Sequence, residues 1–409
     1  MRKTSGVAFT PIRVGTMELD RRLVVSSHSG GGGSLLGPEP LFERHCAYWT
    51  ARIRGSAAWV GGGPNFVANP MIPGFEPTGV GSNGPGLFRA VNFVERLGRF
   101  MGRLHDAGGY GSVQFVQQGG MPSAPSPSLS GYADHRVPHA LDRDEIDWLV
   151  REYGESAALA AAGQADALEL HANHHDDVLQ WFLSPLTNQR TDAYGGTPEK
   201  RRRLLREIVE AMRARVDRPI TIGLRLCMDE MIDGGLTVTD CEDLVAAFTV
   251  DGTVDYFSLD VGDNWGRISY IPPGVYAEAQ WAPLCGQIKQ ATHLPVVYVG
   301  HVTSLATAEP ILGHSEEVRP CIALQECIDR RVVENLPFAC GVNPRAGRDD
   351  EPVLTATGQL SVLVVGGGPA GSEFAALIAE QGHRVQLWEQ AAALGGVPLT
   401  FCWPAPDCS

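Results

Sequence analysis

Histidine and aspartate side chains crowd one short stretch of the chain, HANHHDD at residues 171–177. Such side chains bind metal ions, move protons or contact a cofactor. A zinc site needs ligands that converge on one point, whereas a run on a strand-to-loop turn scatters its side chains. We therefore rank a metal site below two other interpretations. The first is contact with a substrate or cofactor through His171 and His174, and the second is a solvated loop.

A glycine-rich turn in LSVLVVGGGPAGSEFAALIAEQGHRVQLWE, residues 360–389, indicates a second kind of chemistry. The segment predicts a strand, a turn, a helix and a second strand that ends in an acid. Gly366, Gly368, Gly371 and Glu389 have about the spacing of the dinucleotide-binding fingerprint. Bare amides at a helix N-terminus suit a pyrophosphate, and the acid suits a ribose hydroxyl. The segment therefore predicts a nucleotide-binding unit.

Composition limits the partners of the 409-residue chain. Its formal net charge of −14 argues against nucleic acids and anionic membrane surfaces. No apolar run is long enough to span a bilayer, and the basic start MRKTSGVAFTPIRVG lacks the apolar core of a secretory signal. Without an export signal, the nine cysteines are expected to be reduced thiols or ligands. We expect a cytoplasmic protein.

Short apolar runs alternate with helix-like segments over most of the chain. Thr197 and Pro198 mark one helix start, with threonine as the N-cap and proline in the first turn. Strand–helix alternation predicts a parallel sheet, and seven repeats favour a (β/α)8 (TIM) barrel over an open sheet. The apolar runs are residues 22–27, 57–62, 111–117, 166–172, 219–226, 254–262 and 294–300, and the helical segments between them are 41–53, 89–108, 144–163, 199–216, 237–250 and 281–292.

The polar stretch SPLTNQRTDAYGG, residues 184–196, carries a specific resemblance. With VQFVQQGG, LELHANH, GLRLCMDE, VGDNWG and GGGPAG in the same order, the chain resembles the Old Yellow Enzyme-type NADH:flavin oxidoreductases. It is most similar to their long branch of 2,4-dienoyl-CoA reductase, trimethylamine dehydrogenase and N-methyl amino acid demethylases. The resemblance implies FMN at the C-terminal ends of the barrel strands, a 4Fe-4S cluster in a cysteine segment and a region for FAD or ADP. In that family the polar loop packs over the barrel mouth and is mainly architectural.

The resemblance implies four regions. They are an FMN-binding TIM barrel at residues 1–318, an iron-sulfur-type cysteine segment at 319–345, a linker at 346–358 and a truncated Rossmann-like unit at 359–409. After the seventh apolar run, residues 313–318 leave little room for an eighth strand. We therefore expect an incomplete phosphate site, weak FMN binding and no retained FAD.

The same resemblance assigns site residues. His174 matches a substrate-facing histidine and His171 replaces a tyrosine. Arg225 is expected beside the flavin ring, where a cation stabilises the charge of the reduced form, with an internal salt bridge as the alternative. Gln117 is expected to pair with the pyrimidine edge, with a surface amide as the alternative. Ser26 and Ser27 are expected to approach the ring through backbone atoms, and Gly300, after the seventh apolar run, is assigned to the flavin site as well.

Several residues depart from the family pattern. His28 and Ser29 stand where one amine dehydrogenase line attaches its flavin to cysteine, so a covalent flavin is not expected. Trp265 matches one wall of an aromatic cation box, with simple packing as the alternative, while Gly63 and Ile268 replace another aromatic residue and a catalytic aspartate.

The cysteine segment also departs from the family. Cys321, Cys327 and Cys340 stand at three of the family's four ligand positions, with Cys340 at the fourth, and Leu324 occupies the second. Thiolates are the usual cluster ligands, so a 3Fe-4S cluster, a 4Fe-4S cluster with a non-protein ligand and no cluster all stay open.

These features together predict an FMN-dependent oxidoreductase that moves a hydride between a small-molecule substrate and the flavin. Oxidative N-demethylation of a small methylated amine or amino acid is the preferred reaction. The alternatives are enoate or 2,4-dienoyl-CoA reduction with NAD(P)H, and an inactive remnant of the family. The expected electron partner is NAD(P)H or an electron-transfer protein, and a homo-oligomer is left open.

Overall fold

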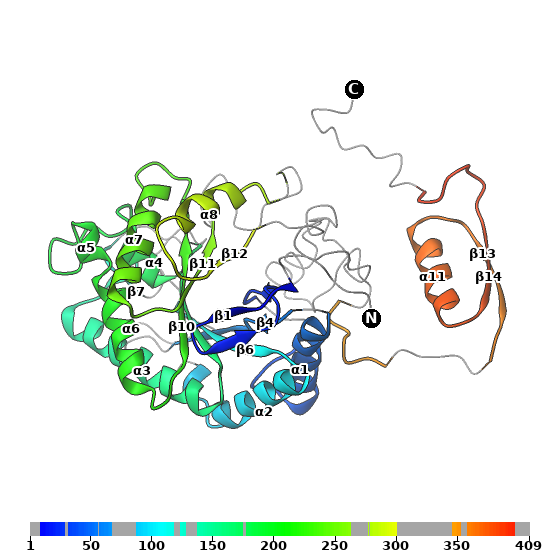
Figure 1. The fold of residues 1–409 in the computed structure, drawn as a ribbon, viewed down its shortest axis with the longest axis horizontal. Coiled ribbons are helices and arrows are strands. Elements are labelled where there is room, and N and C mark those ends of the chain that lie inside the picture. The colour runs from blue at the N-terminus through cyan, green and yellow to red at the C-terminus, as the bar shows by residue number, and fades with distance from the viewer. Residues whose placement is uncertain are drawn as a thin grey trace. The chain divides into compact units, whose positions relative to one another are not determined.

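The computed structural model describes residues 9–28, 32–55, 57–67, 87–117, 123–127, 137–174, 177–262, 277, 279–300, 346–352 and 358–396. The chain divides into two compact units, Met1–Asp350 and Glu351–Ser409 (Figure 1). The expected absence of an eighth barrel strand concerns residues 301–345, which lie outside the described residues.

Seven parallel strands of the first unit form a nearly closed barrel, in the order β3-β4-β6-β9-β10-β11-β12 within the described residues. The predicted TIM-type barrel is confirmed. The short β5 (Pro64–Phe66) also pairs with β6, and β7 (Ser123–Ala124) pairs with β8 (His139–Ala140) outside the barrel. The barrel strands are β3 (Val24–Val25), β4 (Trp59–Val60), β6 (Tyr110–Val116), β9 (Ala167–Ala172), β10 (Thr221–Cys227), β11 (Tyr256–Asp260) and β12 (Val296–Tyr298).

Helices cover the outside of the barrel (Figure 1). Asp142 and Glu145 form a reciprocal capping box at the start of α3, and Thr197 caps α5 with Pro198 in its first turn, as predicted. The helical elements are α1 (Glu39–Arg54), η2 (Leu87–Arg89), α2 (Phe93–Asp106), α3 (Arg143–Ala162), α4 (Val178–Leu183), α5 (Pro198–Arg201), α6 (Arg203–Arg215), α7 (Val238–Asp251) and α8 (Ala282–Lys289). None of these, nor α11 (Pro369–Glu380) of the second unit, has the length and hydropathy of a membrane span among the described residues.

The barrel has two apolar cores. A large cluster lies between the strands and the helices, and a small one closes the N-terminal ends of the strands. The hairpin of β1 (Ile12–Val14) and β2 (Met17–Leu19) inserts Val14, Met17 and Leu19 into the small cluster. The backbone amide of Thr16 donates to the Thr221 hydroxyl at 2.9 Å, which fixes the hairpin to β10. The barrel is therefore sealed at the end opposite the C-terminal ends of its strands.

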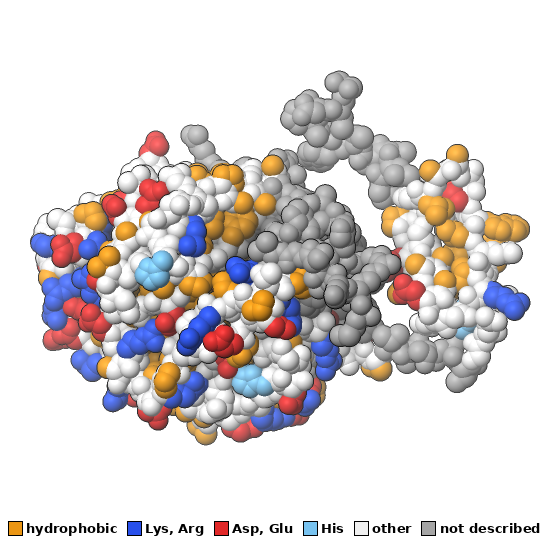
Figure 2. All heavy atoms as spheres, viewed as in Figure 1, with side chains coloured by type: hydrophobic (Ala, Val, Ile, Leu, Met, Phe, Trp, Pro, Cys, Tyr) orange, Lys and Arg blue, Asp and Glu red, His pale blue; other side chains and the backbone are white. Residues whose placement is uncertain are grey.

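The second unit is one βαβ element. β13 (Ser361–Val365) and β14 (Arg384–Trp388) pair in parallel, and α11 (Pro369–Glu380) connects them. Val364 is buried, but Val365 and Trp388 on the opposite face of the sheet are 76% and 61% exposed. Apolar side chains accordingly gather on the visible surface of this unit (Figure 2). Within the described residues, the single βαβ element thus leaves one sheet face uncovered.

Gly223→Ala should destabilise the barrel, because a Cβ at this position would lie 2.1 Å from the Tyr256 ring carbon Cζ. Overpacking of this kind costs about 1–3 kcal/mol. Gly102→Ala in α2 is the matched control, since its Cβ would meet nothing within 4 Å. Urea unfolding should show a lower free energy of unfolding for Gly223→Ala and one higher by up to about 1 kcal/mol for Gly102→Ala. Equal stability of Gly223→Ala and the unmodified chain would contradict the packing.

Candidate functional site

Polar side chains meet at the C-terminal ends of the barrel strands, which we call the mouth. His171 lies on β9 and Arg225 is its direct register partner on β10. Ser26 follows β3, and Gln117 follows β6 and is fully buried. The surface-amide alternative for Gln117 is therefore wrong. The strands bring the predicted barrel residues to one place because parallel strands end at a common edge.

A buried ion pair organises the mouth. Nη2 of Arg225 donates to Oδ2 of Asp260 at 2.8 Å, and Nη1 donates to the Ser26 hydroxyl at 2.7 Å. Both charged residues are at most 4% exposed. The salt bridge that the sequence left as an alternative is thus present in this structure. Ser26 contacts Arg225 through its side chain, whereas the sequence suggested backbone contacts with a cofactor.

The two predicted histidines continue this network. Nε2 of His174 lies 3.0 Å from Oδ2 of Asp260, and Nε2 of His171 lies 3.3 Å from Nδ1 of His174. Burial opposes ionisation of Asp260, but the hydrogen bond from His174 and the positive charge of Arg225 outweigh it and lower the Asp260 pKa. An ionised Asp260 accepts a hydrogen bond from His174 Nε2–H, so Nδ1 of the neutral His174 ring accepts a hydrogen bond from His171 Nε2–H.

His171 is held as a neutral ring. Burial, followed by the electrostatic influence of His174 and Arg225, lowers the pKa of His171 well below 6.5. His171 and His174 are only 5% and 7% exposed, so the solvated-loop interpretation is wrong for both. His174 adopts a left-handed backbone with φ of 64°, an unusual conformation for a residue other than glycine. Within the described residues no group of three or more metal-ligating side chains is present.

Asp177 anchors the mouth from behind His171. Its Oδ1 accepts a hydrogen bond from the backbone amide of Leu179 at the start of α4, and its Oδ2 accepts one from the backbone amide of Gln117 at 2.9 Å. The same Oδ2 lies 3.5 Å from His171 Nδ1. One carboxylate therefore fixes the end of β6, the first turn of α4 and the back of the histidine pair.

The polar loop at residues 184–196 is fixed by its own hydrogen bonds. Asn188 donates to the carbonyls of Phe182 and Tyr194, and Arg190 donates to the carbonyls of Pro125 and Leu141. The Ser184 hydroxyl donates to the buried carboxylate of Glu230, which follows β10. These contacts clamp neighbouring strand-end loops together, in line with the architectural role predicted from sequence.

Two further histidines, the partly buried His28 and the buried His45, lie near the end of β3. His28 contacts the Ser26 carbonyl through Nδ1 at 2.9 Å and the Tyr48 hydroxyl through Nε2 at 2.6 Å. His45 packs edge-on against Phe100, and its Nε2 has no hydrogen-bond partner among the described residues. Burial is the main cause that lowers the pKa of each ring from 6.5 to about 4.

Of the other site residues predicted in the first unit, Gly300 lies within the described residues. Gly300 follows β12 with φ of 156°, and a Cβ there would lie 2.9 Å from the Tyr298 hydroxyl. Trp265 and Ile268 lie outside the described residues. So do the three predicted ligands Cys321, Cys327 and Cys340, together with Leu324.

The glycine turn of the second unit has a locked conformation. Gly366 has φ of 100°, and a Cβ on Gly371 would lie 2.0 Å from the Gly366 carbonyl oxygen. Glu389 accepts the amides of Gly367 at 2.6 Å and of Ala391 at 2.8 Å. Gly368 caps α11 in an extended conformation. The four fingerprint residues thus occupy one strand–turn–helix corner.

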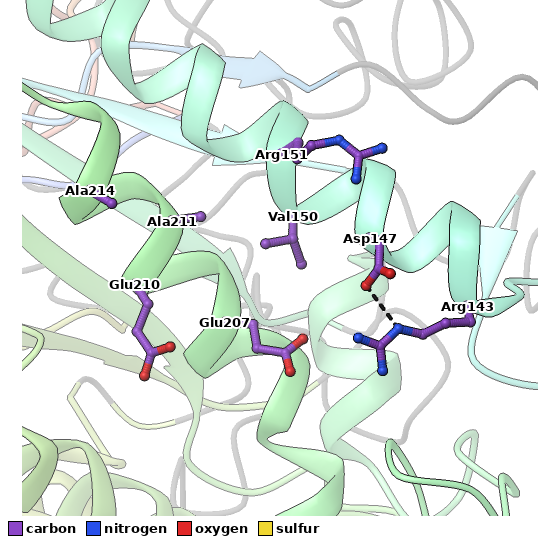
Figure 3. Close-up of a pocket in the computed structure, with 8 residues that line it drawn as sticks. All are labelled: Arg143, Asp147, Val150, Arg151, Glu207, Glu210, Ala211 and Ala214. Carbon is purple, nitrogen blue, oxygen red and sulfur yellow. Dashed lines mark hydrogen bonds and ion pairs between the residues drawn. The ribbon is translucent and has the colours of Figure 1, made fainter.

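A groove lies on the outside of the barrel between α3 and α6, with a volume of about 490 Å³ (Figure 3). Arg143 and Asp147 pair at one end of it, at 2.9 Å. None of the predicted site residues lines this groove. It is lined by Arg143, Asp147, Val150, Arg151, Glu207, Glu210, Ala211 and Ala214.

Residues 8–318 match the model of the NADH:flavin oxidoreductase / NADH oxidase family. The chain belongs to this family. Its members are flavin-dependent oxidoreductases, so the expected family resemblance is confirmed. Residues 364–401 match an NAD(P)-binding Rossmann-like domain.

Similar proteins extend beyond the length of this chain. A metal reductase of Desulforamulus reducens is 30% identical over 95% of the chain and 61% of its own length. An N,N-dimethylglycine/sarcosine dehydrogenase of Chromohalobacter salexigens is 26% identical over 98% of the chain and 62% of its own length. The structure of a 2-naphthoyl-CoA reductase superposes with a TM-score of 0.84 at 21% identity, covering 95% of this chain and 65% of that one, and shows a shared fold. The chain thus spans about three fifths of the length of the curated relatives.

Asp260 and Asp177 are the mouth residues that sequence reasoning missed. The signal for Asp260 was a single acid at the end of the apolar run YFSL, at the strand end where barrel sites are built. The signal for Asp177 was its position before the helix VLQWFL, where an aspartate serves as an N-cap.

The lowered pKa values of His28 and His45 predict acid sensitivity. Both rings stay neutral in the folded chain, while the unfolded chain protonates them below pH 6.5. Their contribution to stability is therefore present above pH 6.5 and is lost as the pH falls toward about 4. Each histidine should contribute a slope of about 1.4 kcal/mol per pH unit in this window.

His45→Phe should reduce that slope by one histidine's share, because phenylalanine keeps the aromatic packing and cannot titrate. Urea unfolding at a series of pH values measures the slope for both proteins. An identical pH dependence in the variant would show that His45 is protonated in the folded chain and would contradict its neutral state.

Proposed function

We propose that the barrel catalyses flavin-dependent oxidation of a small methylated amine or amino acid by N-demethylation. The observation that carries the proposal is the convergence of one buried cation, Arg225, with the linked pair His171 and His174 at the barrel mouth. The family supplies the flavin chemistry, and the similarity to a dimethylglycine/sarcosine dehydrogenase favours this substrate class.

The residues at the mouth fit FMN in type. Nε of Arg225 is buried and has no hydrogen-bond partner among the described residues. Buried polar atoms are rarely left in that state, so this atom suits a polar ligand. Gly61 lets the ends of β3 and β4 approach closely, since a Cβ there would lie 2.3 Å from the Ser27 backbone nitrogen. Arg225, Gln117, Ser26 and Ser27 would hold the flavin, with Gly300 on the phosphate side.

FMN, when bound, supplies the atom that accepts a hydride from the substrate. Arg225 would stabilise the negative charge that reduction places on the ring. The hydrogen-bonded series of His171, His174 and Asp260 would take up a proton released by the amine. The proton would be held between the two imidazole rings. Asp260 would act as the counter-charge and fix the tautomer of His174.

The second unit would contribute a nucleotide site. Gly366, Gly368 and Gly371 would face a pyrophosphate with backbone amides, and Glu389 would face a ribose hydroxyl. We keep the four regions predicted from the sequence as part of this proposal, with a cluster on Cys321, Cys327 and Cys340 and a substrate contact at Trp265. NAD(P)H or an electron-transfer protein would be the electron partner.

Arg225→Met should lower FMN affinity or shift the flavin reduction potential negatively, because the anionic reduced ring loses its counter-charge. Arg225→Lys is the matched control, since it keeps the charge but loses the planar fork. Flavin content after dialysis and a redox titration measure both effects. Unchanged flavin content and reduction potential in Arg225→Met would contradict the placement of Arg225 beside the flavin ring.

His174→Ala should reduce turnover of a methylated amino acid such as sarcosine by a factor on the order of 10² to 10⁴, while FMN stays bound. Asp260→Asn keeps the shape of the aspartate but removes the counter-charge, so it should alter the pH–rate profile. Formaldehyde release and flavin bleaching under anaerobic conditions report the reaction. Turnover by His174→Ala at the unmodified rate, or reduction of cinnamate-type enoates without any amine oxidation, would contradict the proposed function.

A further inference from the structure

Another buried carboxylate lies one layer beneath the mouth. Glu169 precedes His171 by two residues on β9, so it points into the same barrel interior, and it is 5% exposed. Gln114 Nε2 donates to its Oε1 at 2.9 Å, and the Tyr256 hydroxyl donates to its Oε2 at 3.0 Å. Neither the polar loop nor the reaction proposed above uses this group.

The sequence provides the space that this arrangement needs. Gly223 on β10 is the register partner of both Glu169 and Tyr256. Its missing side chain lets the Tyr256 ring cross the strand toward the carboxylate, because a Cβ there would overlap the ring. Trp59 packs edge-on against Tyr256 with ring centroids 4.9 Å apart. Glu169 is therefore held on both sides and cannot turn away.

The hydrogen bonds favour an ionised Glu169, since both partners donate and each carboxylate oxygen accepts. Among the described residues no lysine, arginine or histidine lies within ion-pair distance of it. A buried charge in that position needs compensation from nearby. Arg225 stands two residues beyond Gly223 on β10, about 7 Å along the strand. Burial and the neighbouring Glu169 raise the pKa of Tyr256 well above 10, and the positive charge of Arg225 opposes that shift. The electrostatic effect of Arg225 therefore extends to this layer of the barrel.

We propose that Glu169 is an ionised carboxylate that offsets part of the Arg225 charge and thereby sets how strongly the mouth attracts an anion. The identity of that anion as reduced FMN rests on the proposed function. Glu169 is a positioning residue, since it acts through Arg225 and contacts no ligand. Removing its charge strengthens anion binding, whereas removing the charge of Arg225 weakens it.

The first experiment needs no flavin. Glu169→Gln, Arg225→Met and the double variant form a cycle of unfolding equilibrium constants, and the coupling should be on the order of tenfold in favour of the charged pair. Glutamine fits the site because the Gln114 amide can rotate to accept its new donor. Arg225→Lys keeps the positive charge and is the control, whose effect should add to that of Glu169→Gln; Arg225→Gln replaces Arg225→Met where that variant does not fold. Additive effects of Glu169→Gln and the uncharged Arg225 variant would overturn the proposal.

Infrared difference spectra of the unmodified chain minus Glu169→Gln test the charge directly. We expect the bands of an ionised carboxylate, and a protonated carboxyl band at neutral pH would overturn the proposal.

The second experiment measures how strongly FMN binding favours the reduced over the oxidised form. Glu169→Gln should raise that preference on the order of tenfold, opposite in direction to Arg225→Met. Tyr256→Phe is the matched control, because it removes one hydrogen bond to Glu169 but no charge, and its preference should stay close to that of the unmodified chain. An equal preference in Glu169→Gln and the unmodified chain would overturn the proposal. Failure of the chain to bind FMN would contradict the proposed function instead, and the unfolding cycle and the infrared spectra would then decide the role of Glu169.

Discussion

The buried pair of Arg225 and Asp260 is the interaction on which the mouth depends. Removing one member of a buried pair leaves a charge without compensation, which costs about 3–5 kcal/mol. The pair exists because β10 and β11 are in register from Gly223 to Cys227, so the two charged side chains point inward near the same strand ends. The pair also fixes the direction of the histidine network, since an ionised Asp260 decides which nitrogen of His174 carries the proton.

Local patterns were enough to predict the barrel and most of its polar positions. Apolar runs with helices between them determine a parallel barrel, and parallel strands carry His171, Gln117 and Arg225 to one edge. The partner of His174 could not be predicted in the same way. Asp260 lies 86 residues away, and its contact depends on the register of β9, β10 and β11 rather than on any local pattern. An acid after an apolar run looks the same whether it faces a histidine or solvent.

The stretch at residues 171–196 shows why residue types alone misdirect a site search. Its histidines suggest a metal, yet backbone geometry separates their roles. His171 belongs to a strand, His174 to a left-handed turn, and Asp177 caps the next helix. The loop that follows satisfies its polar groups internally through Asn188 and Arg190. Such a loop can hold strand ends rigidly without contacting a ligand, because its hydrogen bonds leave few backbone groups that need one.

The two units differ in what their stability requires. The barrel buries two apolar cores and seals one end with its own hairpin, so its mouth rests on a packed scaffold. In the second unit, the glycine turn is fixed locally by Glu389 and by the close approach of Gly366 and Gly371. Hydrogen bonds over a few residues create that turn, but burial needs a second layer, and Val365 and Trp388 lack one within the described residues. Nucleotide affinity should therefore depend on what covers this sheet face more than on the turn, since the turn is already formed without it.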